Sequence, residues 1–204
     1  MDLSFFIKGL IFGFSIAAPV GPIGILCIRR SLAKGWTAGL LTGMGAATAD
    51  AIYGCVAGFG ITGITGFLVD QRAWIQIFGG LFLCWLGVRI FLSGTDEKPK
   101  SEAPGSAAMG YLSALLLTLT NPMTILTFAA VFAGMGLGRV TAGRMAAGWL
   151  VAGVFSGSMA WWVILSSASS LFNTRMNAKS MRMINRFSGA VLAGFGLMAV
   201  IGRI

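Results

Sequence analysis

The chain alternates between long apolar segments and short polar ones, and this pattern predicts helices that span a membrane. A helix of about 20 apolar residues crosses the hydrocarbon core of a bilayer. Segments close to this length or longer run over residues 1–28, 36–62, 74–92, 107–134 and 184–201, with one more inside 145–174. We expect the first to be retained as a span, because proline follows Ala17-Ala18 and makes this pair a poor signal-peptide cleavage site.

One clearly polar stretch, residues 93–106, divides the six segments into two sets of three. It mixes acidic and basic residues with two prolines, which is typical of a flexible linker. The sequence therefore predicts a three-helix repeat at 1–92, a cytoplasmic linker at 93–106 and a second three-helix repeat at 107–204, together one transmembrane domain. An odd number of spans inverts one repeat relative to the other. The expected fold class is all-α integral membrane, with six transmembrane helices as two inverted three-helix repeats.

Proline interrupts the first span of each half, where an ordinary helix would continue. The first interruption reads Ala18-Pro19-Val20-Gly21-Pro22-Ile23-Gly24, and the second reads Thr120-Asn121-Pro122. Proline removes a backbone donor and clashes with the preceding turn. Unwound backbone is tolerated at membrane depth only where it faces protein or a water-filled cavity. Either interruption alone also fits a structural kink, but their matching places favour an inverted-repeat transporter, whose sites form at broken helices.

Substrate binding is therefore expected at the two breaks. The candidate binding residues are Pro19, Gly21, Pro22 and Gly24 in the first half, and Thr120, Asn121 and Pro122 in the second. Asn121 offers both a donor and acceptors to an amino-acid carboxylate or ammonium. The alternative role for Asn121 is a cap for the half-helix that begins at Pro122.

Asp50 is the only charged residue between residues 36 and 62. An acid near the middle of a span costs roughly 3 kcal/mol on insertion scales, so it normally faces a cavity or a partner. We predict that Asp50 couples transport to protons or binds a substrate amine; a structural aspartate bonded to a neighbouring helix is the alternative. Tyr53 lies three residues on and shares its helix face, so it is a candidate to hydrogen-bond Asp50 or the substrate, with simple packing equally open.

Composition agrees with a membrane location. Hydrophobic residues make up 56% of the chain and charged residues 10%, whereas soluble domains carry roughly 25% charged residues. The net charge of +9 does not indicate a nucleic-acid partner, because the basic residues form short clusters between apolar segments, as orientation signals do. Basic side chains at the cytoplasmic face also meet anionic membrane lipids.

The basic clusters predict an orientation. The loops after the first, third and fifth spans hold Arg29, Arg30, Lys34, Arg89, Lys98, Lys100, Arg175, Lys179, Arg182 and Arg186. The opposite side holds Lys8, Arg72, Arg139, Arg144 and Arg203. Because cytoplasmic loops carry the excess of Lys and Arg, we expect the first set in the cytoplasm and both termini outside.

Other classes of function find less support in the residues. Histidine is absent and the three cysteines show no CxxC spacing, so no metal site or cofactor is expected. We expect no enzyme, because no nucleophile–base pair or carboxylate dyad lies within the spans. The rival readings are a metal or inorganic-ion efflux transporter on a related six-helix scaffold, which would need a ligand cluster, and a non-transporting subunit, which would not explain two broken spans. Gly-x-x-x-Gly pairs such as Gly9/Gly13 and Gly153/Gly157 indicate close helix packing inside one bundle, and a homodimer interface stays open.

These features together resemble the lysine-exporter (LysE/RhtB-type) family of bacterial amino-acid exporters. The resemblance covers nearly the whole chain. It rests on Pro19-Val20-Gly21-Pro22, Arg30-Ser31-Leu32-Ala33-Lys34-Gly35, Ala38-Gly39-Leu40, the run from Gly43 to Asp50, Gly79-Gly80, Leu86-Gly87-Val88-Arg89 and Thr120-Asn121-Pro122. A more usual first motif is Pro-Gly-Pro, without the intervening Val20. The resemblance implies proton-coupled efflux of an amino acid or small derivative across the bacterial inner membrane; which amino acid it would be is not readable.

Overall fold

The computed structural model describes residues 2–19, 21–58, 71–93, 106–121, 124, 127–128, 144–172 and 178–201. Every regular element within these ranges is an α-helix. The helices are α1 (Asp2–Ala17), α2 (Pro22–Lys34), α3 (Trp36–Gly58), α5 (Arg72–Leu92), α6 (Ser106–Leu119), α8 (Arg144–Ser170) and α9 (Ala178–Val200). The all-helical fold class is therefore confirmed for the described residues. Most of the expected linker 93–106 lies outside them.

Local chemistry explains where several of these helices begin and end. Pro22 occupies the first helical position of α2, where its missing N–H costs nothing. Gly35 has a φ of 89°, a left-handed conformation that favours glycine, and it separates α2 from α3. The first apolar segment was expected to end at residue 28, but α2 continues to Lys34, and α9 begins at Ala178 rather than at 184. Hydropathy marks where a helix leaves an apolar environment, whereas the hydrogen-bonded helix runs on into its charged turns.

Two of these helices are long and apolar enough to cross a bilayer by themselves, over Met145–Ser170 and Lys179–Val200. The pair Leu3–Ala17 and Pro22–Lys34 is bent by 80° and makes a third crossing if it forms one broken span. The segments Gln76–Leu92 and Ala108–Leu119 are apolar but shorter. Large apolar side chains, among them Trp74, Phe78 and Phe187, are more than 60% exposed. Such a surface fits a membrane protein, while the count of six spans stays a prediction.

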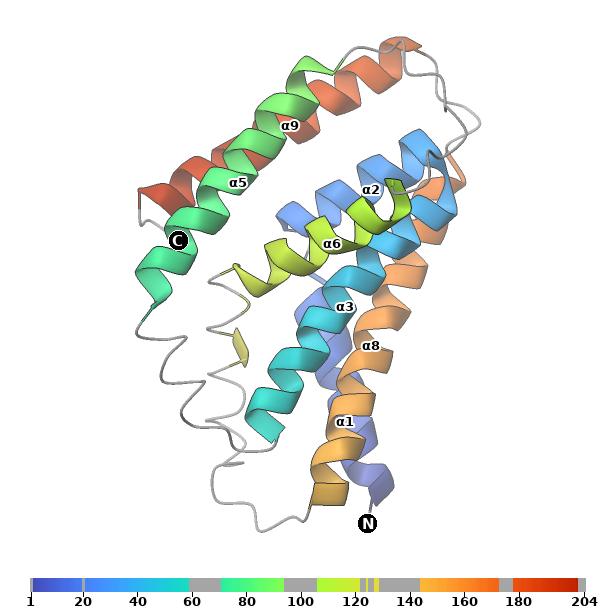
Figure 1. Ribbon diagram of the computed structural model, residues 1–204. Helices are drawn as coiled ribbons and strands as arrows, with labels where there is room; N and C mark the ends of the chain where they lie inside the picture. The colour runs from blue at the N-terminus through green and yellow to red at the C-terminus, as the bar shows by residue number, and fades with distance from the viewer. Residues whose placement is uncertain are drawn as a thin grey trace.

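Helices from the two halves of the chain pack against each other (Figure 1). The first helix, α1, packs on α8, and α6 in turn packs on α3. The helices α3 and α8 also contact one another, and α5 lies along α9. Between the α5–α9 pair and the group of α1, α3 and α8 lie α2 and α6. The breaks that follow α1 and α6 are thereby brought to the middle of the molecule.

Glycines allow two of these helix pairs to approach closely. A Cβ atom on Gly153 would lie 2.8 Å from the backbone nitrogen of Leu10, and one on Gly9 would lie 3.0 Å from that of Val154. The Gly-x-x-x-Gly pairs of α1 and α8 therefore pack against each other inside the bundle, as expected. The α5–α9 pair uses the same device, because a Cβ on Gly189 would lie 2.6 Å from the carbonyl oxygen of Gly87.

Candidate functional site

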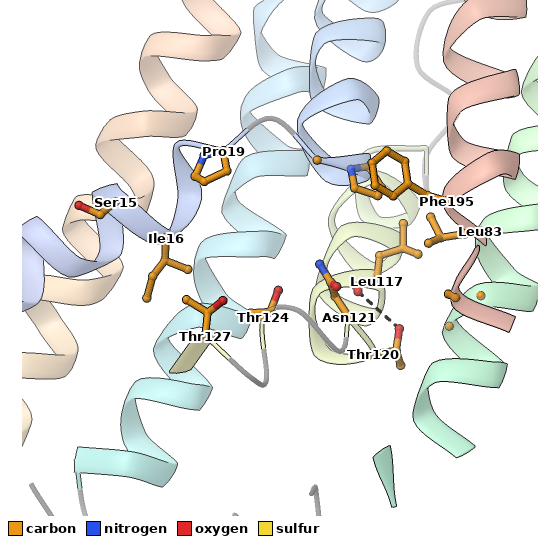
Figure 2. Close-up of a pocket in the computed structure, with 15 residues that line it drawn as sticks. Ser15, Ile16, Pro19, Leu83, Leu117, Thr120, Asn121, Thr124, Thr127 and Phe195 are labelled. Atoms are coloured by element: carbon orange, nitrogen blue, oxygen red, sulfur yellow. Dashed lines mark hydrogen bonds between the residues drawn. The ribbon is translucent and has the colours of Figure 1, made fainter. Parts of the chain in front are cut away.

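A cavity of about 340 Å³ lies between the two helix breaks (Figure 2). Both halves of the chain contribute to its wall. The lining residues are Ser15, Ile16, Pro19, Gly21 and Pro22 from the first break, Leu117, Thr120, Asn121, Thr124 and Thr127 from the second, Gly79, Gly80 and Leu83 from α5, and Phe195 and Ala199 from α9. None of these side chains is charged, and the polar ones are hydroxyls and one amide. The described wall is therefore neutral and partly polar.

The first break ends one helix and starts another beside the cavity. The N–H of Ala18 donates to the carbonyl of Phe14 over 2.9 Å and closes the last turn of α1, and the N–H of Gly21 donates to the carbonyl of Pro19 over 2.9 Å. The carbonyl of Gly21 then accepts from Ile25 over 3.1 Å and begins α2. The first N–H groups of a helix and its last carbonyls have no intrahelical partners. The cavity therefore adjoins donors at the start of α2 and acceptors at the end of α1.

The second break is held by side chains as well as backbone. The Thr120 hydroxyl donates to the carbonyl of Leu116 over 2.8 Å. The backbone N–H of Asn121 donates to the backbone carbonyl of Thr118 over 3.2 Å. The hydroxyl of Tyr53, on α3, donates to the carbonyl of Leu119 over 2.6 Å. Figure 2 shows the side chain of Asn121 among the other residues that line the cavity. Tyr53 thus donates to one of the last carbonyls of α6, a group for which a helix end has no intrahelical partner.

Asp50 lies on α3 with only 3% of its surface exposed. The hydroxyl of Ser158, on α8, donates to its carboxyl oxygen over 2.7 Å. The indole N–H of Trp162 donates to the same Ser158 hydroxyl over 3.1 Å. The carboxyl group therefore has a partner on a neighbouring helix, α8, as the structural alternative for Asp50 requires.

The structure gathers most of the expected binding residues but not all. Pro19, Gly21, Pro22, Thr120 and Asn121 line one cavity, although a hundred positions separate the breaks. Gly24 is buried within α2 and is not part of the described wall. Pro122 lies outside the described residues.

Asp50 and Tyr53 stand apart from this wall. Tyr53 is buried and packs against Phe128, Ile16 and Leu119, so it lies one layer behind the lining residues. Its single proton is directed to the Leu119 carbonyl, which leaves none for Asp50. Of the roles left open for Tyr53, the hydrogen bond to Asp50 is not the one that the structure has, because the hydroxyl donates to the end of α6 instead.

Several wall residues were missed by reasoning from the sequence. Ser15, Thr124 and Thr127 add hydroxyls to the cavity, and Phe195 closes it from α9. Hydroxyls within a helix close to a proline break were the available signal. Nothing in the pattern of α9 distinguishes Phe195 from Phe187, the other aromatic residue of this helix.

Two adjacent arginines, which were predicted as orientation signals, connect neighbouring helices through hydrogen bonds. The Arg30 guanidinium donates to the Thr42 hydroxyl over 2.9 Å, to the carbonyl of Gly110 over 2.9 Å and to the Ser113 hydroxyl over 2.8 Å. Nε of Arg29 donates to the side-chain oxygen of Asn185 over 2.9 Å. Arg30 thus joins the C-terminal part of α2 to α3 and α6, and Arg29 joins it to α9.

Comparison with known proteins identifies the kind of molecule to which this site belongs. The family model described as LysE type translocator matches residues 14–203. The chain belongs to the LysE family of translocators. A member of this family is a multi-pass membrane transport protein, in agreement with the apolar helices and exposed apolar surface. The resemblance inferred from the sequence motifs is confirmed.

Two of the three curated relatives described next are named for amino-acid efflux. The threonine efflux protein of Escherichia coli (strain K12) is 30% identical over 158 residues, covering 72% of this chain and 75% of its own. The putative amino acid efflux protein YcgF of Bacillus subtilis (strain 168) is 24% identical over 198 residues, covering 95% and 94%. The uncharacterized membrane protein YahN of Escherichia coli (strain K12) is 31% identical over 178 residues, covering 85% and 78%. No solved structure matches the chain.

Proposed function

We propose that this LysE-type protein exports small neutral amino acids from the cytoplasm across the bacterial inner membrane by proton antiport. The observation that carries the proposal is a cavity that both helix breaks line, with a described wall that is neutral and partly polar. Its relatives include a protein named for threonine efflux and one named for amino acid efflux, and these names support this substrate class.

The two breaks supply complementary ends for a zwitterion. The start of α2 has no side-chain cap, so the N–H groups of its first turn after Pro22 and the positive end of the helix dipole favour the substrate carboxylate. The C-terminal ends of α1 and α6 present carbonyls that favour the ammonium. Asn121, with a donor and acceptors, lines the same cavity.

The wall also limits the side chain of the substrate. A lysine, arginine or glutamate side chain would enter a described wall without an opposite charge, and burying an unpaired charge is costly. Hydroxyls of Ser15, Thr120, Thr124 and Thr127 instead suit a small or hydroxylated side chain. We therefore expect threonine and serine to be preferred over charged amino acids.

Asp50 is the proposed proton-coupling residue. Because it does not line the described cavity, we propose that it binds the proton and leaves the substrate ammonium to the carbonyls at the breaks. Tyr53 follows Asp50 by one helical turn and holds the carbonyl of Leu119 at the second break. A change of charge at Asp50 would thus reach the cavity through Tyr53.

Alternating access would arise from an inverted repeat. The helix contacts support this, because α1 on α8 and α6 on α3 are the same contact with the two halves exchanged, and α3–α8 and α5–α9 each pair corresponding helices. The energetics are adequate: one charge crossing about 150 mV yields roughly 3.5 kcal/mol. A tenfold gradient costs roughly 1.4 kcal/mol, so one proton sustains a gradient of a few hundredfold for a zwitterion.

The test uses purified protein in liposomes loaded with labelled amino acids, with an imposed pH gradient. We expect gradient-driven transport of threonine or serine, at least about tenfold less of lysine and glutamate, and loss of gradient dependence in Asp50→Asn. Gradient-driven transport by Asp50→Asn at the wild-type rate would refute proton coupling at this residue. Transport of none of the amino acids by the wild type, with liposome insertion verified, would refute the export proposal itself.

A further inference from the structure

A second cavity, also of about 340 Å³, lies between α2 and α9, away from the candidate site. Its wall is apolar except for one hydroxyl, and is formed by Ile25, Ile28 and Leu32 of α2 with Met183, Ile184, Phe187 and Ser188 of α9. Met183 is 68% exposed and Phe187 67% exposed, so this groove opens to the surroundings of the molecule. The Arg29–Asn185 hydrogen bond of 2.9 Å joins the same two helices and fixes their spacing.

The charges on these two helices are all of one sign. Lys34 ends α2, and Lys179, Arg182 and Arg186 lie in the first turns of α9; all four side chains are exposed. Neither residues 22–34 nor residues 178–200 contain an aspartate or glutamate. The C-terminal end of α2 and the N-terminal end of α9 lie at the same end of the molecule (Figure 1). An apolar groove therefore runs toward a rim of basic side chains.

We propose that this groove binds an anionic phospholipid, with an acyl chain along the apolar wall and its headgroup at the basic rim. An apolar groove alone accepts any acyl chain, but basic side chains at the membrane surface favour an anionic headgroup. A second copy of the chain is a poorer occupant, because a twofold contact on this face would bring like charges together. The proposal does not depend on the substrate or on proton coupling.

The test is native mass spectrometry of the protein in a neutral detergent, titrated with dioleoyl phosphatidylglycerol or dioleoyl phosphatidylcholine. These lipids share their acyl chains and differ in headgroup charge. We expect phosphatidylglycerol to bind at least about fivefold more tightly. The double variant Arg182→Gln/Arg186→Gln should lose most of this preference. The matched control Lys8→Gln/Arg89→Gln removes two other exposed bases and should keep it.

A groove variant separates the acyl contact from the charge. Phe187→Ala should weaken both lipids to a similar degree, because it shortens the apolar wall and leaves the rim intact. These side chains are exposed, so we expect the variants to fold, and circular dichroism with size-exclusion chromatography checks this. Equal binding of the two lipids, or equal loss in the Arg182/Arg186 and Lys8/Arg89 variants, would overturn the proposal. A dimer that forms without bound lipid and is lost in Phe187→Ala would assign the groove to a second copy instead.

Discussion

At the scale of single residues, the partners of Asp50 decide how it can act. Its carboxyl oxygen accepts from Ser158, and Ser158 is itself oriented by the indole of Trp162. A hydrogen bond to a charged group contributes about 1.5–3 kcal/mol, more than one between neutral groups. Ser158 thus holds the carboxyl in one position between α3 and α8. It is a positioning residue for the proposed proton site.

The first prediction therefore concerns Ser158. We expect Ser158→Ala to lower gradient-driven transport at least about tenfold, in line with the loss of one such hydrogen bond. Ser156→Ala is the matched control, since Ser156 lies on the same helix and is only partly buried; it should transport like the wild type. Liposome transport under an imposed pH gradient measures both. If the two variants transport equally, Ser158 has no part in coupling.

The second prediction uses the only two tyrosines of the chain. Tyr53→Phe removes the donor to Leu119 at the second break, whereas Tyr111→Phe removes a 3.1 Å hydrogen bond to Thr48 away from the cavity. Leaving the partly buried carbonyl of Leu119 without this donor costs up to about 1–3 kcal/mol. We expect Tyr53→Phe to weaken substrate binding about fivefold or more and Tyr111→Phe to leave it unchanged. Equilibrium binding of labelled threonine measures this, and a larger loss in Tyr111→Phe would contradict it.

Much of the candidate site was predictable because proline and buried charge are costly in lipid and so stand out. Pro19, Pro22 and Asn121 were found for this reason, and they share one cavity. The partner of Asp50 was not predictable. Ser158 is one of several serines in α8, and only the packing of α8 on α3 selects it. Phe195 and Thr127 are likewise ordinary in their own segments and join the wall only through tertiary contacts.

At the scale of helices, glycine positions decide which pairs approach closely. On α9, a Cβ on Gly196 would lie 2.6 Å from the backbone nitrogen of Cys84 and 2.6 Å from the carbonyl oxygen of Gly80. A Cβ on Gly194, two residues earlier, would meet nothing within 4 Å. Only one face of α9, the face that carries Gly196, thus packs closely against α5. The lining residues Gly79, Gly80 and Ala199 depend on this pairing for their position.

The third prediction follows from that contrast. Gly196→Ala forces a methyl group against backbone and should destabilise the protein by about 1–3 kcal/mol, the usual cost of overpacking. Gly194→Ala should be neutral or stabilising by up to about 1 kcal/mol, because alanine favours the helix. Thermal unfolding in one detergent, followed by circular dichroism, compares them. Equal melting temperatures would show that the α5–α9 contact is looser than the structure has it.

Hydropathy located all seven described helices within or next to the apolar segments, yet it misplaced some of their ends. The apolar pattern does not record the charged turns at Lys34 and Lys179, because a helix continues through them on hydrogen bonds alone. The apolar pattern also does not show which helices pack against each other. That α1 packs on α8, rather than on a helix of its own half, depends on matched glycine pairs whose periodicity recurs in several other helices.

At the scale of the whole molecule, the arrangement turns on how α1 and α2 cross the membrane. Their 80° bend fits a broken span, with its two ends on opposite sides, or a re-entrant loop, with both ends on one side. Arg29 and Arg30 tie the end of α2 to α9 and to α3 and α6. The side of the membrane on which that end lies therefore fixes the side of the whole tied cluster. The inverted repeat requires a broken span, because an even number of crossings would leave the halves parallel.

The last prediction separates these arrangements by labelling single cysteines with a membrane-impermeant maleimide, in intact spheroplasts and after lysis. The background replaces Cys27, Cys55 and Cys84, and the labelled sites are the exposed positions Ser4, Lys34, Met145 and Leu171. Met145 and Leu171 lie at the two ends of one apolar helix that is long enough to cross a bilayer, so their labelling from opposite sides is the internal control. We expect Ser4→Cys and Met145→Cys to label in intact spheroplasts, and Lys34→Cys and Leu171→Cys only after lysis, because the larger set of basic residues belongs in the cytoplasm. If Ser4 and Lys34 label from the same side, α1 and α2 form a re-entrant loop, and the proposed inverted repeat is wrong.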